Sequence, residues 1–265
     1  ATGILTTDHH TLAAVVEIVH MATLVHDDVL DGADERRGQK PVNAISGNVA
    51  AVLLGDYLVS HAYHLCSGLD DQYAARRIAA TANVVCEGEL LQNELRGDVL
   101  LTEQAYLAIV ERKTAALTAT SCELGARFSG ADPAVVQVMQ SFGRAAGVAF
   151  QIIDDVLDIV GDRNKVRKTL GSDLALGKPT LPTIHCLASA RTDIAESLRA
   201  VLAGEAPGSD CQLRRWLEDT GSLDYAVSVA EGYVRDALSQ LEAVPMSDAR
   251  SSLTAIAEFI AHRQF

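Results

Sequence analysis

The sequence predicts an all-helical fold, and three observations support this. Ala, Leu and Val dominate the 265 residues while aromatic residues contribute only 5%, a composition that favours helix over sheet. No proline occurs between Pro41 and Pro133, and apolar residues recur there every three or four positions. Strand-like alternation never extends beyond a few residues. No shift in composition marks a boundary, so we expect residues 1–265 to form a single domain.

The first half of the chain divides into long helices by its apolar spacing. A helix is expected from about Thr7, which Thr7 or Asp8 would cap and Gly32 would end. The polar segment 34–41 is broken by Gly and Pro and is predicted to be a loop. The next helices are expected at about 48–65, 72–95, 102–128 and 134–160.

The second half opens with a charged, glycine-containing segment at 162–179, which is predicted to be a mobile loop. Helices are expected to resume at about Leu181, and Gly204–Asp210 is a polar break. Amphipathic helices are predicted at 213–220, 225–241 and 249–262.

Charge and cysteine content narrow the class of protein. The formal net charge of −13 makes a nucleic-acid partner unexpected. Five scattered cysteines without a Cys-x-x-Cys pair indicate reduced thiols and a cytoplasmic location. We expect no transmembrane segment, because no apolar run reaches about eighteen residues, and we find no signal peptide. The chain begins close to a helix, which suggests an incomplete version of a longer protein.

A repeated aspartate motif is the strongest signal in the sequence. The segment Asp27–Asp31, with sequence Asp-Asp-Val-Leu-Asp, recurs letter for letter as Asp154–Asp158. On a helix the first and last aspartates of each copy lie on one face, where like charges repel. Oxygen-only ligands favour a hard cation, and Mg²⁺ completes its coordination with water and substrate phosphates. The alternative is a pair of solvated acidic helix ends.

Together with Arg36-Arg37-Gly38 and the Lys-x-x-Gly-x-Asp-Leu…Gly-Lys-Pro run from Lys168 to Pro179, this motif pair resembles the trans-isoprenyl diphosphate synthases, or polyprenyl synthases. The resemblance covers nearly the whole chain. It implies an isoprenoid synthase helical bundle, an α-barrel around a central active-site cavity. It also implies a prenyltransferase that condenses isopentenyl diphosphate head to tail with an allylic diphosphate. A homodimer, with loose membrane contact for product release, is expected too.

The resemblance also implies the metal ligands. Three Mg²⁺ ions are expected with substrate bound: Asp27 and Asp31 would hold two, and Asp154 a third. Asp28, Asp155 and Asp158 would support these ligands through water or through contacts behind them.

The resemblance implies roles for further residues in catalysis and substrate binding. Arg36 would grip the allylic diphosphate and Arg37 isopentenyl diphosphate, because the arginine fork binds phosphate oxygens bidentately. His20 would help to bind isopentenyl diphosphate, unless it is simply a satisfied core histidine. The other matches are the catalytic candidates Lys113, Thr114, Gln151, Lys168 and Lys178. The final proton is expected to go to the departing diphosphate, with Gln92 as a weak alternative.

One family motif, Gly-Lys-x-x-Arg-Pro, lies upstream of the first aspartates in relatives and is absent here. The expected reason is truncation. The alternative is a subunit that lacks half of one substrate site.

Product length is predicted from the residues before the first aspartates. Short-chain members carry a bulky aromatic there, whereas this chain has Ala22 and Thr23, and no Phe or Tyr from Thr7 to His26. The 20 residues from Thr7 to Asp27 give about 30 Å of helix, enough to line about six isoprene units of roughly 5 Å. A long-chain product is therefore expected. The alternatives are a class I terpene cyclase and a non-catalytic or regulatory subunit of a two-chain synthase.

Overall fold

The computed structural model describes residues 1–36, 38–161, 172–206 and 209–263. Over these residues the chain is helical, and its only β-type pairing is an isolated bridge between Arg36 and Gln39. The all-helical prediction is confirmed. The predicted mobility of the loop falls largely on 162–171, outside the described residues.

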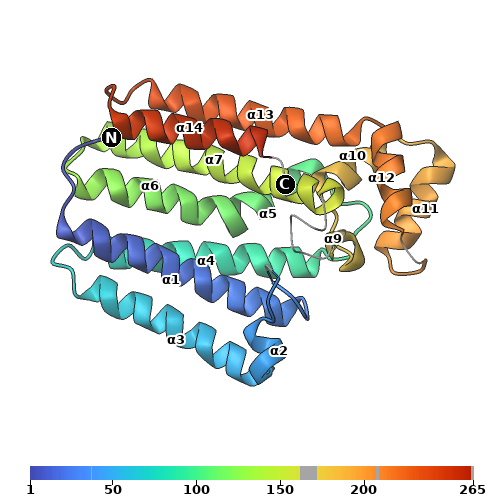
Figure 1. Ribbon diagram of the computed structural model, residues 1–265, viewed down its shortest axis with the longest axis horizontal. Coiled ribbons are helices and arrows are strands. Elements are labelled where there is room, and N and C mark those ends of the chain that lie inside the picture. Colours follow the sequence, from blue (N-terminus) through green and yellow to red (C-terminus); the bar gives the residue numbers. More distant parts are fainter. Residues whose placement is uncertain (37, 162–171, 207–208, 264–265) are drawn as a thin grey trace.

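Seven long helices form the bundle (Figure 1). They are α1 (Thr7–Leu30), α3 (Asn48–Ser67), α4 (Tyr73–Glu94), α6 (Ala116–Phe128), α7 (Pro133–Val160), α13 (Ser222–Leu241) and α14 (Asp248–His262). The shorter helices are α2 (Val42–Ser46), α5 (Glu103–Val110), the π-helical turn η1 (Glu111–Ala115), α9 (Ser172–Ala175), α10 (Leu181–Ser189), α11 (Thr192–Leu202) and α12 (Asp210–Asp219).

The helix bounds agree closely with the spacing of apolar residues, with three differences. The helix expected over 102–128 is interrupted by η1. The short helix α9 lies in the segment predicted to be a loop, and α2 lies between the loop predicted at 34–41 and the helix predicted from about 48, because four or five residues are too few to show a helical period. The first helix is capped by Thr6 and not by Thr7 or Asp8: the backbone N–H of Thr6 donates to Nδ1 of His9 at 3.0 Å.

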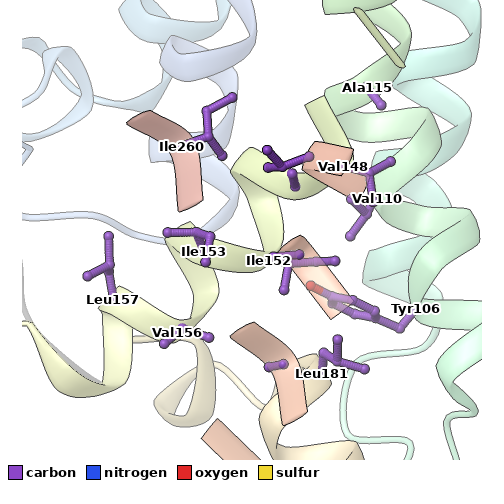
Figure 2. Close-up of a cluster of buried hydrophobic side chains, with 14 of the residues drawn as sticks. Tyr106, Val110, Ala115, Val148, Ile152, Ile153, Val156, Leu157, Leu181 and Ile260 are labelled. Atoms are coloured by element: carbon purple, nitrogen blue, oxygen red, sulfur yellow. The ribbon is translucent and has the colours of Figure 1, made fainter. Parts of the chain in front are cut away.

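The bundle is layered in the order α3, α1, α4 and α6, α7, then α13 with α14 (Figure 1). The largest core cluster lies between α5, α7, α10 and α13 and includes Val110, Val148, Ile152 and Leu181 (Figure 2). A second core joins Val15 and Val19 of α1 to Ala62, Ile78 and Leu124 of the neighbouring helices. The first of these clusters packs α7, and the second packs α1.

The helix α3 is the exception to the expectation that no segment suits a membrane. It is long and apolar enough to cross one by length and composition alone, with a mean hydropathy of 1.2 and only 22% of that stretch buried. Its inner face packs along α1, where an added Cβ on Gly55 would meet the ring of His26. Its outer face carries Val49, Leu53 and Tyr57 exposed to solvent.

The fold brings the two aspartate motifs to one end of the bundle. The helices α1 and α7 run in the same direction and finish at the end where α9 lies (Figure 1). Lys178 reaches Asp31 from the chain just after α9, and the backbone N–H of Asp173 in α9 donates to Asp158 at 3.1 Å. Residues 147 positions apart in the sequence therefore meet at this end.

Candidate active site

The first aspartate motif occupies the last turn of α1, and its three carboxylates have different surroundings. Asp28 is almost fully buried and accepts a 2.6 Å hydrogen bond from Nε of Arg36. The side chains of Asp27 and Asp31 are 19% and 22% exposed and each lies near a lysine. Asp28 is thus paired with Arg36, whereas Asp27 and Asp31 are partly exposed.

Lys113 sits among acidic and amide oxygens from two other helices. Its Nζ lies 2.5 Å from Oε2 of Glu89, 2.9 Å from Oε1 of Gln92 and 3.6 Å from Oδ2 of Asp27. Burial alone would lower the pKa of Lys113, but Asp27 and Glu89 outweigh it and raise that pKa above its usual value. Burial raises the pKa of Asp27 to about 6, against the opposing pull of Lys113. Glu89 holds Lys113 in place and was missed in the sequence, although it lies one turn before Gln92.

The π-helical turn η1 presents Lys113 and Thr114 to the site. Single π-turns inside helices recur at functional sites. Two glycines allow neighbouring helices to approach this turn. A Cβ on Gly88 of α4 would lie 2.7 Å from Cβ of Arg112, and one on Gly147 of α7 would lie 2.8 Å from Cα of Ala115. The turn is therefore packed backbone to backbone on two sides.

The second aspartate motif is linked to η1 by a chain of hydrogen bonds. Thr114 donates to Oε1 of Gln151 at 2.7 Å, and Nε2 of Gln151 donates to Asp155 at 2.7 Å. The hydroxyl of Tyr106 donates to the other oxygen of Asp155 at 2.6 Å. Burial and the nearby Asp173 raise the pKa of Asp155 to about 8. Asp155 is thus a buried anchor for Gln151 and Tyr106.

The remaining aspartates of the second motif differ in exposure. Asp158 is buried at the contact with α9. The side chain of Asp154 is 38% exposed, and Nη2 of Arg263 lies 3.7 Å from its Oδ1. The guanidinium of Arg263 stacks over the ring of Phe150, 4.7 Å from its centre. Sequence analysis did not identify Arg263, because it follows α14 and reaches α7 only in the folded chain.

Other predicted site residues are placed as follows. Lys178 is buried and donates to both oxygens of Asp31 at 2.7 and 2.8 Å. His20 is half-buried on the face of α1 that carries Asp27, since seven residues make about two turns. Ala22 is fully buried, and Thr23 is half-buried. Arg37 and Lys168 lie outside the described residues.

The oxygen donors of the site suit a divalent cation. In the described part of the chain, no three Asp, Glu, His or Cys side chains converge closely enough to hold an ion by themselves. Asp27 and Asp31 offer carboxylate oxygens on one helix face, and Asp154 offers one from the other motif. This donor set fits an ion that takes its remaining ligands from water and from a phosphorylated substrate.

An all-helical bundle that ends in two aspartate motifs, flanked by lysines and arginines, defines the class of isoprenoid synthases. A sequence model of the family described as "Polyprenyl synthetase" matches residues 3–219. The chain belongs to this family and is a prenyltransferase, as the sequence predicted.

Named relatives support the family and span several product lengths. The chain is 34% identical to octaprenyl diphosphate synthase of Escherichia coli over 96% of its length and 79% of that protein. It is also 34% identical to a short chain isoprenyl diphosphate synthase of Methanothermobacter thermautotrophicus, over 96% of this chain and 79% of that protein. A polyprenyl synthase of Caulobacter crescentus, complexed with calcium and isoprenyl diphosphate, superposes with a TM-score of 0.94 at 34% identity. That likeness covers 98% of this chain and 80% of the other.

Proposed function

We propose that this prenyltransferase is a Mg²⁺-dependent synthase of long-chain, all-trans polyprenyl diphosphates, built from isopentenyl diphosphate and an allylic diphosphate. The observation that supports this most strongly is the meeting of two aspartate motifs with Lys113 and Lys178 at one end of the bundle. The calcium and isoprenyl diphosphate of the Caulobacter crescentus relative are consistent with a metal-diphosphate site.

Asp27, Asp31 and Asp154 are the proposed metal ligands, for three ions when substrate is bound. Bound Mg²⁺ would neutralise the charge that develops on the diphosphate as the allylic carbon–oxygen bond breaks. Asp28, Asp155 and Asp158 are proposed to support these ligands from behind, since each is buried and bonded to the protein.

The cations are proposed to bind and orient the diphosphates. Lys113 is held by Glu89 and Gln92, so its ammonium group is aimed toward Asp27 and the allylic substrate. Thr114 and Gln151 would line the space beside the allylic carbon, oriented by Asp155. Lys178 would exchange its bonds to Asp31 for the allylic diphosphate. Arg36, Arg37, His20 and Lys168 keep the binding roles that the family resemblance implies.

A long-chain product is proposed from the residues that precede Asp27. The similarity to relatives does not select a length, since octaprenyl and short-chain synthases are equally identical to the chain. Ala22 and Thr23 are small at the positions where the family resemblance implies that an aromatic ring would close a tunnel. Deeper along α1, Val15 and Val19 meet aliphatic neighbours.

A homodimer is proposed on the outer face of α3. Val49, Leu53 and Tyr57 are 76%, 63% and 62% exposed on this one helix. A contiguous apolar face of this kind commonly marks an interface. We also propose a single domain over residues 1–265, and a cytoplasmic location because all five cysteines are free.

Turnover by the purified full-length protein with isopentenyl diphosphate, farnesyl diphosphate and Mg²⁺ tests the proposed function. Mass spectrometry should detect acyclic polyprenyl diphosphates, with no partner protein added. A cyclic hydrocarbon would instead indicate a terpene cyclase, and activity only with a second chain would indicate a subunit of a two-chain synthase.

A further inference from the structure

We infer that Arg96, together with Lys178, forms a diphosphate-binding cation pair, in which Arg96 positions the allylic diphosphate. The inference rests on the proposed function and adds a residue that neither motif contains. Arg96 lies in the turn after α4, outside the aspartate motifs and outside the arginine pair of 36 and 37.

The first observation is that two positively charged side chains, Lys178 and Arg96, both bind the single carboxylate of Asp31. Lys178 donates to both carboxylate oxygens of Asp31, and Nη2 of Arg96 donates to Oδ1 at 3.1 Å. One carboxylate thus faces two cations. Because the proposed metal ions need Asp31, its two cationic partners must find another anion when substrate binds.

The second observation is an unused donor on Arg96. Among the described residues, Nε of Arg96 is buried and has no hydrogen-bond partner. Nε and Nη2 form one edge of the guanidinium, the edge that binds carboxylates and phosphates through two parallel bonds. Asp31 occupies only the Nη2 half of this edge. A phosphate oxygen would satisfy the Nε half, once Asp31 has turned toward a metal ion.

The third observation is a tether that keeps the two cations together. The backbone N–H of Gly97 donates to the carbonyl of Gly177 at 2.7 Å. Both glycines have positive φ, of 77° and 66°, a conformation that favours glycine. A Cβ on Gly177 would lie 3.7 Å from Cγ of Arg96 and 3.1 Å from the carbonyl oxygen of Leu202. The tether joins the residues next to Arg96 and Lys178, so the two cations face Asp31 as a pair.

Charge and geometry indicate the ligand. The edge of Arg96 faces the motif that carries the proposed metal ligands, so the fitting ligand is the diphosphate shared with those ions. We therefore expect Arg96 to act on the allylic diphosphate and on the departing diphosphate, and not on isopentenyl diphosphate.

The test compares Arg96→Gln, Arg96→Lys and the control Arg76→Gln, an exposed arginine in α4, the helix that precedes Arg96. Isothermal titration calorimetry with inorganic diphosphate and Mg²⁺ measures binding without turnover, and steady-state kinetics give KM for each substrate. For Arg96→Gln we expect about tenfold weaker diphosphate binding and a similar rise in KM for farnesyl diphosphate, ~1.4 kcal/mol. KM for isopentenyl diphosphate should change less than about twofold. Arg96→Lys should recover part of the loss, because it keeps the charge and loses the fork.

Unchanged diphosphate affinity in folded Arg96→Gln would overturn the inference. So would an equal loss for both substrates, or a loss matched by Arg76→Gln. If the wild-type protein shows no turnover, the proposed function is wrong. If the wild-type protein is active and substitution of Arg96 does not change diphosphate binding, only the inference about Arg96 is wrong.

Discussion

A methyl group added to Gly88 would lie 2.7 Å from the backbone nitrogen of Lys113, so α4 and η1 are in backbone contact at this point. Nothing larger than glycine fits there without a shift of one helix. Lys113 owes its place beside Asp27 to this contact together with its bonds to Glu89 and Gln92. The closeness of two helices thus sets the position of a side chain that we propose to act in catalysis.

Replacing Gly88 by alanine should displace Lys113. We expect Gly88→Ala to lower kcat/KM at least about tenfold and the free energy of unfolding by about 1–3 kcal/mol, because the added methyl overpacks a rigid contact. Chemical denaturation and steady-state kinetics measure both. The matched control is Gly125→Ala in α6, where an added Cβ meets nothing within 4 Å. The control should keep its activity and gain about 0.5–1 kcal/mol of stability, and similar kinetics in both variants would contradict the prediction.

Loss of a proposed metal ligand should abolish turnover without unfolding the protein. Burial raises the pKa of Asp27 to about 6, so the carboxylate that predominates at pH 7 destabilises the folded state relative to the unfolded one. Asp27→Ala and Asp154→Ala should therefore keep their helical circular dichroism, with Asp27→Ala no less stable than wild type. The exposed Asp236→Ala in α13 serves as control and should remain active. Near-normal rates of either motif variant at saturating Mg²⁺ would rule out the metal-site assignment.

An aromatic ring before the first aspartate should shorten the product. Ala22→Phe is expected to shift products toward geranylgeranyl or farnesyl diphosphate while the first condensation survives. Ala22 is fully buried, so overpacking could cost about 1–3 kcal/mol, and thermal unfolding must be measured alongside product length.

A substitution at Thr23, the residue next to Ala22, tests which face of α1 lines the tunnel. At about 100° per residue, Ala22 lies about 140° around the helix from Asp27, and Thr23 only about 40°. Thr23→Phe should shorten products with a smaller loss of stability. If only Thr23→Phe shortens them, the tunnel follows the Asp27 face of α1. Wild-type lengths from both folded, active variants would show that α1 is not the tunnel wall.

The exposed face of α3 should hold the proposed dimer together. Leu53→Asp places a charge in the middle of that face, and analytical ultracentrifugation should show monomers at micromolar concentration where the wild type is dimeric. Leu100→Asp is the control, because Leu100 is 79% exposed and is not part of α3. A monomeric wild type, or an unchanged dimer in Leu53→Asp, would contradict the prediction.

The sequence by itself determined the helical class, most helix bounds and the two aspartate motifs. These are local properties: a period of 3.6 residues and an exact repeat are visible without any knowledge of packing. Because these signals are local, the sequence did not predict the short helices α2 and α9 or the π-helical turn η1. Short helices show no period, and a π-turn depends on the helices packed against it.

Only the tertiary structure separated the aspartates into buried and accessible ones. Six identical side chains look alike in sequence, yet Asp155 is bonded to Tyr106, 49 residues away, while Asp31 is bonded to Arg96, 65 residues away. Glu89 and Arg263 were likewise identified only from the structure, because each contacts a site residue that is distant in the chain. The energy of a buried carboxylate depends on which donors the fold brings to it, and those donors come from helices that are distant in the chain.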